Sequence, residues 1–405
     1  MELTTASLWI LIAGALVLLM TPALGLFYGG MTRATGVVNM MLMSFSAAAI
    51  TAVVWVLWGY SLSAGQPAIA GLIGNPLSDF GLAQTDPADL LDVGFAGAFA
   101  MIAVAIISGA IADRSRFGAW LVFVPVWVSV VYAPIAFWIW GGGMLSADGV
   151  LGGFFGEAID FAGGAVIHTN AGVAALVLAL KLGQRHNFHD RPQPHNTPLV
   201  MLGAALLWFG WFGFNAGAAT TIEQAGLIWV NTLAAPAAAV LGWVLVEKLR
   251  GSRPSSVGVA SGLVAGLVAI TPACANIAPW AALLLGIVSG AAAAWAVGLK
   301  WKLGYDDSLD VVGVHLVAGL IGTVALGFIA LPSEETAGGL FYGGGFALLV
   351  SQVVACVVVI IFSAAATWVI ATLVDKIIPW RIDSDVEVAG IDAAEHEESG
   401  YQLAR

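Results

Sequence analysis

Long apolar stretches separated by short polar connections run through the whole chain. Each stretch is about 20 residues long or longer, the length that an α-helix needs to cross roughly 30 Å of hydrocarbon. A transmembrane β-barrel would instead alternate polar and apolar residues in shorter blocks. The pattern therefore predicts an all-α polytopic membrane protein with eleven transmembrane helices, at about 6–28, 37–62, 92–112, 118–140, 161–182, 197–217, 224–247, 256–273, 277–299, 310–331 and 343–374.

The composition supports this class. Hydrophobic residues make up 60% of the chain and charged residues 10%, whereas soluble proteins average about 25% charged residues. Glu2 but no Lys or Arg precedes the first apolar stretch, so the basic flank of a cleavable signal peptide is missing and we interpret this stretch as a retained span. Cys274 and Cys356 are solitary and have apolar neighbours, which favours small buried side chains over a disulfide or a metal site.

Basic residues lie in alternate connections between the apolar stretches. Cytosolic connections of membrane proteins collect Lys and Arg, so this alternation assigns the two sides. All 14 basic residues follow odd-numbered stretches: Arg33, Arg114, Arg116, Lys181, Arg185, Arg191, Lys248, Arg250, Arg253, Lys300, Lys302, Lys376, Arg381 and Arg405. The N-terminus is therefore predicted outside and the C-terminus in the cytosol.

The opposite side carries only acidic side chains. An acidic mouth raises the local concentration of cations and repels anions, although salt screens the effect beyond about 10 Å. The alternative is that the outer loops need charge only for solubility. The acidic residues assigned to this side are Glu2, Asp79, Asp86, Asp89, Asp92, Asp148, Glu157, Asp160, Glu223, Glu334 and Glu335.

Two pairs of short motifs recur at an offset of five stretches. LGLFYGG (24–30) ends the first stretch and WFGFNAG (211–217) ends the sixth, while GGAVIHTNAG (163–172) and DVVGVHLVAG (310–319) lie in the fifth and the tenth. Because the offset is odd, equivalent helices run in opposite directions. The chain is thus predicted to contain an inverted five-plus-five repeat, with a pathway near the bilayer midplane where the repeats meet.

Only two of the six histidines lie in apolar surroundings. His168 lies about 10 Å into the membrane from Phe161, and His315 about 8 Å from Asp310 on the cytosolic side. If the two stretches are neighbours, the imidazoles approach each other near the bilayer centre. An ionisable group at that depth is a candidate functional site. For either one alone, the alternative is a structural histidine bonded to a backbone carbonyl.

Small residues share a helical face with each histidine, which allows close helix approach and leaves room for a narrow lumen. A neutral imidazole offers one hydrogen-bond donor and one acceptor and titrates near neutrality. A small weak base that sheds a proton to cross would suit such a pair. Two nitrogens without a carboxylate or thiolate make an incomplete metal site, so we expect no metal or other cofactor. The small residues are Gly164, Ala171, Gly172 and Ala175 beside His168, and Gly319 and Gly322 beside His315.

Several residues predicted toward the outer side are open to two interpretations. Trp140 ends the fourth stretch and fits either an interfacial aromatic belt or a cation site. The same choice between packing and cation contact applies to Phe95, Phe99 and Phe214. Asp160, at the outer start of the fifth stretch, can cap that helix or stabilise an incoming cation. The remaining histidines, in a cytosolic loop and the tail, are interpreted as solvated: His186, His189, His195 and His396.

Over nearly its whole length the chain resembles the ammonium transporter family, which includes the Amt, Mep and Rh proteins. It is most similar to the bacterial or archaeal Amt type, and it carries, in family order, FYGGMTR, FAGAFA, WGGG, DFAGGAVIHTNAG, WFGFNAG and DVVGVHLVAG. The resemblance implies a homotrimer of eleven-helix subunits in the plasma membrane, each with its own pore. It also implies a transporter or channel for ammonium, not an enzyme.

Carried over to matching positions, the resemblance implies specific roles. His168 and His315 are similar to the twin histidines of the pore, and Phe99 and Phe214 to the stacked gate. Trp140, with Phe95 and Phe99, resembles the outer site that recruits ammonium, and Asp160 resembles the supporting acid below it. Ala218 stands where many relatives have a serine at the recruitment site. The segment 144–159 is also longer than is common in the family.

Residues 1–374 are predicted to form the transporter domain and residues 375–405 an acidic cytosolic tail. In the family this face engages PII-type signal proteins, so the tail is expected to be regulatory. Within it, Glu397 stands where relatives usually have glycine. The leading hypothesis is ammonium transport by recruitment, deprotonation and passage of ammonia, with the proton relayed separately. The alternatives are an ammonium sensor and an electroneutral channel for ammonia or carbon dioxide, as in the Rh branch.

Overall fold

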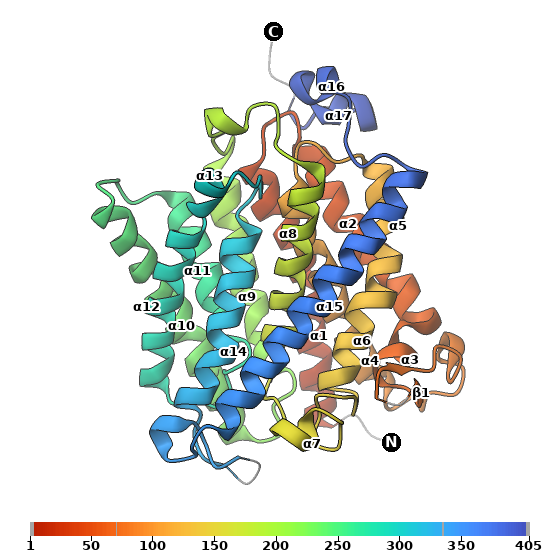
Figure 1. Ribbon diagram of the computed structural model, residues 1–405, viewed down its shortest axis with the longest axis vertical. Helices are drawn as coiled ribbons and strands as arrows, with labels where there is room; N and C mark the ends of the chain where they lie inside the picture. Colours follow the sequence, from red (N-terminus) through yellow and green to blue (C-terminus); the bar gives the residue numbers. More distant parts are fainter. Residues whose placement is uncertain (1–3, 70, 334–335, 402–405) are drawn as a thin grey trace.

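The computed structural model describes residues 4–69, 71–333 and 336–401. Most helices run side by side between two ends of the molecule, with the C-terminal helices α16 and α17 at one end and the start of α1 at the other (Figure 1). Four residues of the predicted charge map, Glu2, Glu334, Glu335 and Arg405, lie outside the described residues.

Among the described residues, all elements except one hairpin are helices. In chain order the elements are α1 (Thr5–Met31), α2 (Val37–Val54), η1 (Trp55–Gly59), α3 (Tyr60–Ala64), β1 (Pro67–Ile69), β2 (Ile73–Gly74), η2 (Phe80–Leu82), α4 (Leu90–Ile107), η3 (Ser108–Ile111), α5 (Phe117–Trp127), η4 (Val128–Tyr132), α6 (Ala133–Ile139), α7 (Gly152–Phe155), η5 (Gly164–Thr169), α8 (Asn170–Leu182), η6 (Phe188–Asp190), α9 (Thr197–Ala216), α10 (Ile222–Leu249), α11 (Ser256–Ile270), α12 (Pro279–Ala296), α13 (Leu299–Leu303), η7 (Val312–Val317), α14 (Ala318–Ile329), η8 (Leu340–Tyr342), α15 (Ala347–Ile377), α16 (Ser384–Ala389) and α17 (Ile391–His396).

Every one of the eleven predicted apolar stretches is helical. Within the described part of the chain, ten helices are long and apolar enough to cross a membrane, so the protein is a multi-pass membrane protein. The stretch at 256–273 forms α11, whose 15 residues are shorter than a typical span. The count of eleven spans therefore stays a prediction. The antiparallel hairpin of β1 and β2 was not predicted.

Side-chain oxygens at the N-termini of several helices accept hydrogen bonds from the free amides of the first turn. Thr4, Asn196, Thr221 and Ser255 cap α1, α9, α10 and α11 in this way. These capping residues lie in polar connections and mark the helix starts in the sequence. The local signals therefore agree with the apolar pattern about where the long helices begin.

Close packing of α1 and α9 depends on glycine. A Cβ added at Gly203 of α9 would lie 2.4 Å from the backbone nitrogen of Phe27 in α1, and one added at Gly210 would lie 2.4 Å from the Met20 side chain. Absent side chains at these positions let the two helices approach more closely than larger residues would allow. Their shared interface leads to Phe214, near the C-terminal end of α9.

The C-terminal tail is tied to the helix ends by its carboxylates. Asp392 accepts hydrogen bonds from the amides of Val38 and Asn39 in the first turn of α2, at 3.0 and 2.8 Å. Glu395 accepts one from the Phe117 amide at the start of α5, at 3.0 Å. Negative charge is stabilised at helix N-termini. Burial, the largest influence, nevertheless raises the pKa of Asp392 above its ordinary value, while the two amides oppose the shift.

Two histidines predicted to be solvated instead form hydrogen bonds with residues that are distant in the sequence. His396 Nε2 lies 2.9 Å from Asn39 Oδ1, and its ring meets Phe117 edge-on at 5.0 Å. His195 contacts the Thr32 carbonyl and the Tyr401 hydroxyl, each at 2.8 Å. The polar sequence around both residues suggested solvent because it gives no sign of the fold that brings these partners together. Glu397 adopts a left-handed conformation with φ of 55°, the region that glycine favours.

Candidate functional site

The two histidines from apolar surroundings face each other in the interior. His168 Nδ1 lies 3.2 Å from His315 Nδ1, and the ring centroids are 5.3 Å apart at 26°. Both residues are buried, with 1% and 2% of their surface exposed. In a hydrogen bond between the two Nδ1 atoms, one ring donates and the other accepts. The neutral pair must therefore hold opposite tautomers, leaving one Nε2 as an acceptor and the other as a donor.

Both histidines lie in wider, π-helical turns. His168 belongs to η5 and His315 to η7, and each segment leads directly into a regular helix, α8 and α14. Single π-helical turns inside α-helices are frequent at functional sites. The wider turns occur where the two rings meet, which is consistent with a site that sets the position of each imidazole.

Glycine allows the two histidine segments to approach. A Cβ added at Gly172 would lie 2.6 Å from the Leu316 amide nitrogen, and one added at Gly319 would lie 3.2 Å from the His168 Cβ. Alanine at Gly172 would thus force the backbones apart. The prediction that small residues beside each histidine permit close approach is confirmed at these two positions.

An indole that was not among the predicted site residues stacks on the His168 ring. Trp211 stacks on it with a centroid separation of 5.4 Å and an angle of 17°. Its Nε1 donates to Thr271 Oγ1 at 2.8 Å, which fixes the indole. His168 Nε2 is buried and has no hydrogen-bond partner among the residues described. Trp211 precedes Phe214 by one helical turn in WFGFNAG, so helical spacing was a usable signal.

Asp160 caps the first histidine segment completely. Its Oδ1 accepts hydrogen bonds from the amides of Gly163 and Gly164, and its Oδ2 accepts from those of Ala165 and Val166, all between 2.5 and 3.1 Å. Gly163 has φ of 112°, a conformation that suits glycine. The capping interpretation of Asp160 is therefore realised, and the carboxylate has its oxygens directed at backbone.

Asp307 plays the matching part at the second histidine segment. Its two oxygens accept from the amides of Val311 and Val312 at 3.1 and 2.7 Å. Asp307 precedes His315 by the same eight residues that separate Asp160 from His168. Asp307 was not among the predicted site residues, although this equal spacing was available as a signal.

Asp307 lies beside a dense cluster of ion pairs. Arg185 binds both oxygens of Asp306 at 2.9 Å, and Arg114 lies 4.0 Å from the same carboxylate. Burial disfavours ionisation of Asp306, but the two guanidiniums lower its pKa below the ordinary value. For Asp307, burial raises the pKa to about 6 despite the nearby Lys300. Charged groups thus lie at the start of the segment that carries His315.

Aromatic rings cover the other side of the pair. Phe99 and Phe214 are stacked with centroids 4.2 Å apart at 10°, and the Phe214 ring lies 6.2 Å from that of His168. Phe95 meets Phe99 edge-on at 4.8 Å, and Trp140 does so at 6.3 Å. The structure therefore brings together the four aromatic residues that the sequence analysis left open between packing and cation contact.

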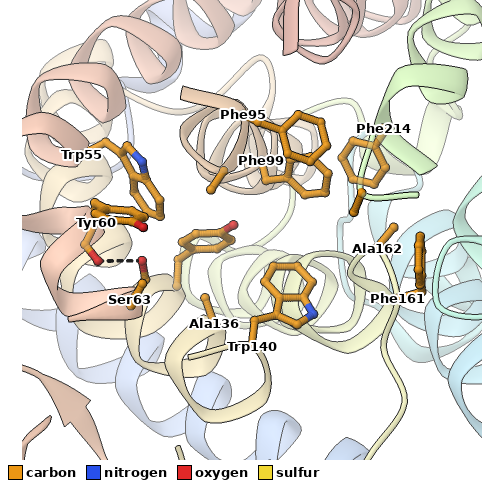
Figure 2. Close-up of a pocket in the computed structure, with 14 residues that line it drawn as sticks. Trp55, Tyr60, Ser63, Phe95, Phe99, Ala136, Trp140, Phe161, Ala162 and Phe214 are labelled. Carbon is orange, nitrogen blue, oxygen red and sulfur yellow. Dashed lines mark hydrogen bonds between the residues drawn. The ribbon is translucent and has the colours of Figure 1, made fainter. Parts of the chain in front are cut away.

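These rings line a pocket of about 260 Å³. Figure 2 shows Phe95, Phe99, Phe214 and Trp140 around it. Trp55, Tyr60 and Tyr132 add a further aromatic wall. These three were missed because aromatic residues in apolar stretches carry no sequence signal that separates pocket lining from core. The lining residues are Trp55, Tyr60, Ser63, Ala64, Phe95, Ala96, Phe99, Tyr132, Ala136, Trp140, Phe161, Ala162, Phe214 and Ala218.

A second, more polar pocket of about 600 Å³ shares Trp140, Phe161 and Ala218 with the first. Glu157 and Asp160 line it, so part of the long segment 144–159 forms its wall. Trp140 Nε1 donates to the Asp160 carbonyl at 2.8 Å, which fixes the indole between the pockets. The arrangement leads from a polar mouth, through an aromatic pocket, to a stacked pair of rings and then to two histidines.

Comparison with known proteins assigns nearly the whole chain to one family. A profile described as the Ammonium Transporter Family matches residues 8–401. The chain belongs to the ammonium transporter family. An ammonium transporter of Mycobacterium tuberculosis is 47% identical over 432 residues, which cover 98% of this chain and 90% of the relative.

Solved structures agree with this assignment. The crystal structure of Candida albicans Mep2 matches with a TM-score of 0.85 and 33% identity, over 94% of this chain and 86% of that chain. A structure described as a sensor Amt protein matches with a TM-score of 0.88 and 27% identity, over 96% of this chain and 98% of that chain. This member of the ammonium transporter family thus has the fold of Amt and Mep proteins.

Proposed function

We propose that this protein transports ammonium across the plasma membrane through a pore constricted by His168 and His315. The observation that carries the proposal is the buried, hydrogen-bonded imidazole pair directly behind the stacked Phe99 and Phe214 rings. Ionisable groups inside the membrane are energetically costly and therefore usually mark a substrate or ion pathway. Family membership supports ammonium as the substrate.

Recruitment takes place in the outer pockets. The acidic predicted outer side, with Glu157 on the polar pocket, raises the local concentration of cations. Faces of Trp140 and Phe99 then attract ammonium through their negative π-clouds, by roughly 0.5 to 2 kcal/mol per ring. Ala218 offers no hydroxyl, so next to this residue binding depends on the rings of Trp140 and Phe161.

Deprotonation precedes passage between the stacked rings. A bare ammonium ion in an apolar passage would lose its hydration at a cost of many kcal/mol, whereas ammonia is neutral and small. The neutral histidine pair presents one Nε2 acceptor and one Nε2 donor. Ammonia both donates and accepts hydrogen bonds, so each side of the pair can hold it in turn. The proton follows by a separate relay that begins at the outer side of the gate.

The pore is one of three in a homotrimer, with the N-terminus outside and the tail in the cytosol. Alternation of the basic residues supports this orientation. An inverted repeat is supported by the eight-residue spacing that Asp160 and Asp307 share relative to their histidines. The docked tail at the cytosolic end is the regulatory element and the place where a PII-type signal protein binds, with Asp392 and Glu395 as its anchors.

Proteoliposomes on a supported membrane test the transport proposal. A jump in ammonium concentration is expected to produce a transient current together with faster ammonia flux than in protein-free vesicles. Absence of both would contradict transport. Faster flux without any current would instead support the electroneutral channel.

A sensor is the second candidate, because the structure described as a sensor Amt protein matches this fold with a TM-score of 0.88. Deleting the tail from Ser384 onward separates the two functions. A regulated transporter is expected to lose control of flux. A sensor would keep its flux unchanged and lose only the signal that it sends.

A further inference from the structure

A basic pocket lies at the predicted cytosolic end of the bundle, and neither histidine of the pair lines it. It is formed where the loop after α8, the end of α10 and the short helix α13 meet (Figure 1). Its volume is about 280 Å³. Three cationic side chains and two indoles line it, together with Gly298 and Leu299: Arg191, Arg250, Lys302, Trp295 and Trp301.

The three cationic side chains of this pocket form no ion pair with a described carboxylate. Seven other basic residues form ion pairs, whereas Arg191, Arg250 and Lys302 form none with any described residue. No acidic side chain is among the residues that line the pocket. An adjoining hollow of about 330 Å³ includes Asp310, but Lys300 neutralises that carboxylate at 2.7 Å. The pocket is therefore a concave site with an uncompensated positive charge.

Several of its walls are fixed in position. Arg250 donates to the carbonyls of Ala294 and Trp295 at 3.0 and 3.3 Å, so its guanidinium is anchored at the end of α12. Trp301 stacks on the buried Phe188 ring with centroids 4.7 Å apart. The Arg191 guanidinium lies 5.4 Å from the Trp301 ring centroid. The basic pocket is thus preorganised for an anion, and guanidinium groups match the geometry of phosphate oxygens.

Apolar side chains around the pocket are exposed. Leu249, Trp295 and Leu303 have 78%, 56% and 71% of their surface accessible. Trp at the end of a membrane-spanning helix is typical of the headgroup level. Basic pockets between helices on the cytosolic side suit lipid headgroups. These surroundings favour a ligand with a phosphate group and acyl chains over a soluble phosphate compound.

We propose that the basic pocket binds the phosphate group of an anionic phospholipid of the cytosolic leaflet, through Arg191, Arg250 and Lys302, with the acyl chains lying over the exposed apolar residues. Neither histidine lines this site, and its existence does not depend on the transport function.

Binding of short-chain lipids to the purified full-length protein tests the proposal. Thermal unfolding in a neutral detergent is followed while dioctanoylphosphatidylglycerol, dioctanoylphosphatidylcholine or inorganic phosphate is titrated. The double change Arg191→Gln and Lys302→Gln removes two pocket charges from exposed side chains. The matched control, Lys248→Gln and Arg253→Gln, removes two exposed charges nearby that line neither hollow.

Phosphatidylglycerol is expected to stabilise the parent and the control equally. The affinity of the pocket variant for phosphatidylglycerol is expected to be about thirtyfold weaker. The single change Lys302→Gln is expected to weaken this affinity by about fivefold. Equal weakening in the control, or equal binding of phosphatidylcholine to the parent, would overturn the proposal. Stabilisation by inorganic phosphate that matches phosphatidylglycerol and is lost in the pocket variant would also overturn it, by identifying a soluble phosphate as the ligand.

Discussion

The two histidine segments use the same backbone device in opposite surroundings. In each, an aspartate eight residues ahead of the histidine accepts hydrogen bonds from the first amides of a π-helical turn. Before His168 the surroundings are aromatic, with Phe214 and Trp211 against the ring. Before His315 they are dense in charge, because Asp307 adjoins the cluster of Arg114, Arg185 and Asp306.

The difference shows which part of each segment is common and which is specialised. Backbone capping sets where each imidazole lies, and this requirement is the same on both sides. In the proposed mechanism the neighbours differ because the outer side attracts a cation and removes its proton, whereas the other side holds the helix ends together. Variants of matching residues in the two segments can therefore separate the positioning of the imidazoles from the selection of the transported ion.

The largest effect is expected from the outer cap. In Asp160→Asn one side-chain oxygen still accepts from two backbone N–H groups. The new side-chain NH₂ group faces the other two N–H groups and cannot accept from them, so two charge-assisted hydrogen bonds are lost. The expected cost is about 3 kcal/mol or more. Asp307→Asn loses one such bond, with an expected cost of about 2 kcal/mol.

Thermal unfolding in detergent, with the yield of membrane-inserted protein, measures both changes. Asp148→Asn serves as the control, because this outer carboxylate is exposed. Equal midpoints for Asp160→Asn and the control would mean that the four amides do not need the carboxylate.

An intermediate effect is expected at the gate. Phe214→Ala removes one of two stacked rings, so water can reach the histidine pair and ions are no longer excluded by an apolar constriction. We expect the potassium rate in proteoliposomes to rise by at least about tenfold, equal to about 1.4 kcal/mol of barrier. Phe212→Ala, on the same helix but packed against Trp229, should leave potassium excluded. Similar leakage in both variants would assign the effect to loosened packing.

The smallest effect is expected at the recruitment pocket. Ala218→Ser places a hydroxyl beside Trp140 and Phe161, at the junction of the two outer pockets. One added hydrogen bond of about 1 kcal/mol would lower the half-saturating ammonium concentration by about fivefold. Ala219→Ser, which adds the same hydroxyl outside both pockets, is the control. An unchanged half-saturation in Ala218→Ser would show that ammonium does not stop at this position.

Much of this arrangement could be predicted from the sequence because membranes constrain it strongly. Long apolar stretches and alternating basic residues outline the helices without any tertiary information. His168 and His315 stood out for the same reason, since polar groups are rare in such stretches.

The rest depends on contacts between distant elements. Trp55 and Tyr132 look like core residues in the sequence, and only the fold places them on the aromatic pocket. Asp307 is hidden among Asp306 and Asp310, which have different partners. The predicted solvation of His396 was wrong because its contact with Asn39 links residues 357 positions apart. Such pairings carry no periodic signal.

The most direct test of the central claim compares ammonium with potassium in proteoliposomes containing the parent, His168→Ala, His315→Ala or the double variant. Current and ammonia flux are recorded together after a jump in either ion. If the pair handles deprotonated ammonia, the parent conducts ammonium and excludes potassium, and the double variant loses this discrimination. If all three variants conduct ammonium and exclude potassium as the parent does, the histidines are structural and the proposed pore mechanism is wrong.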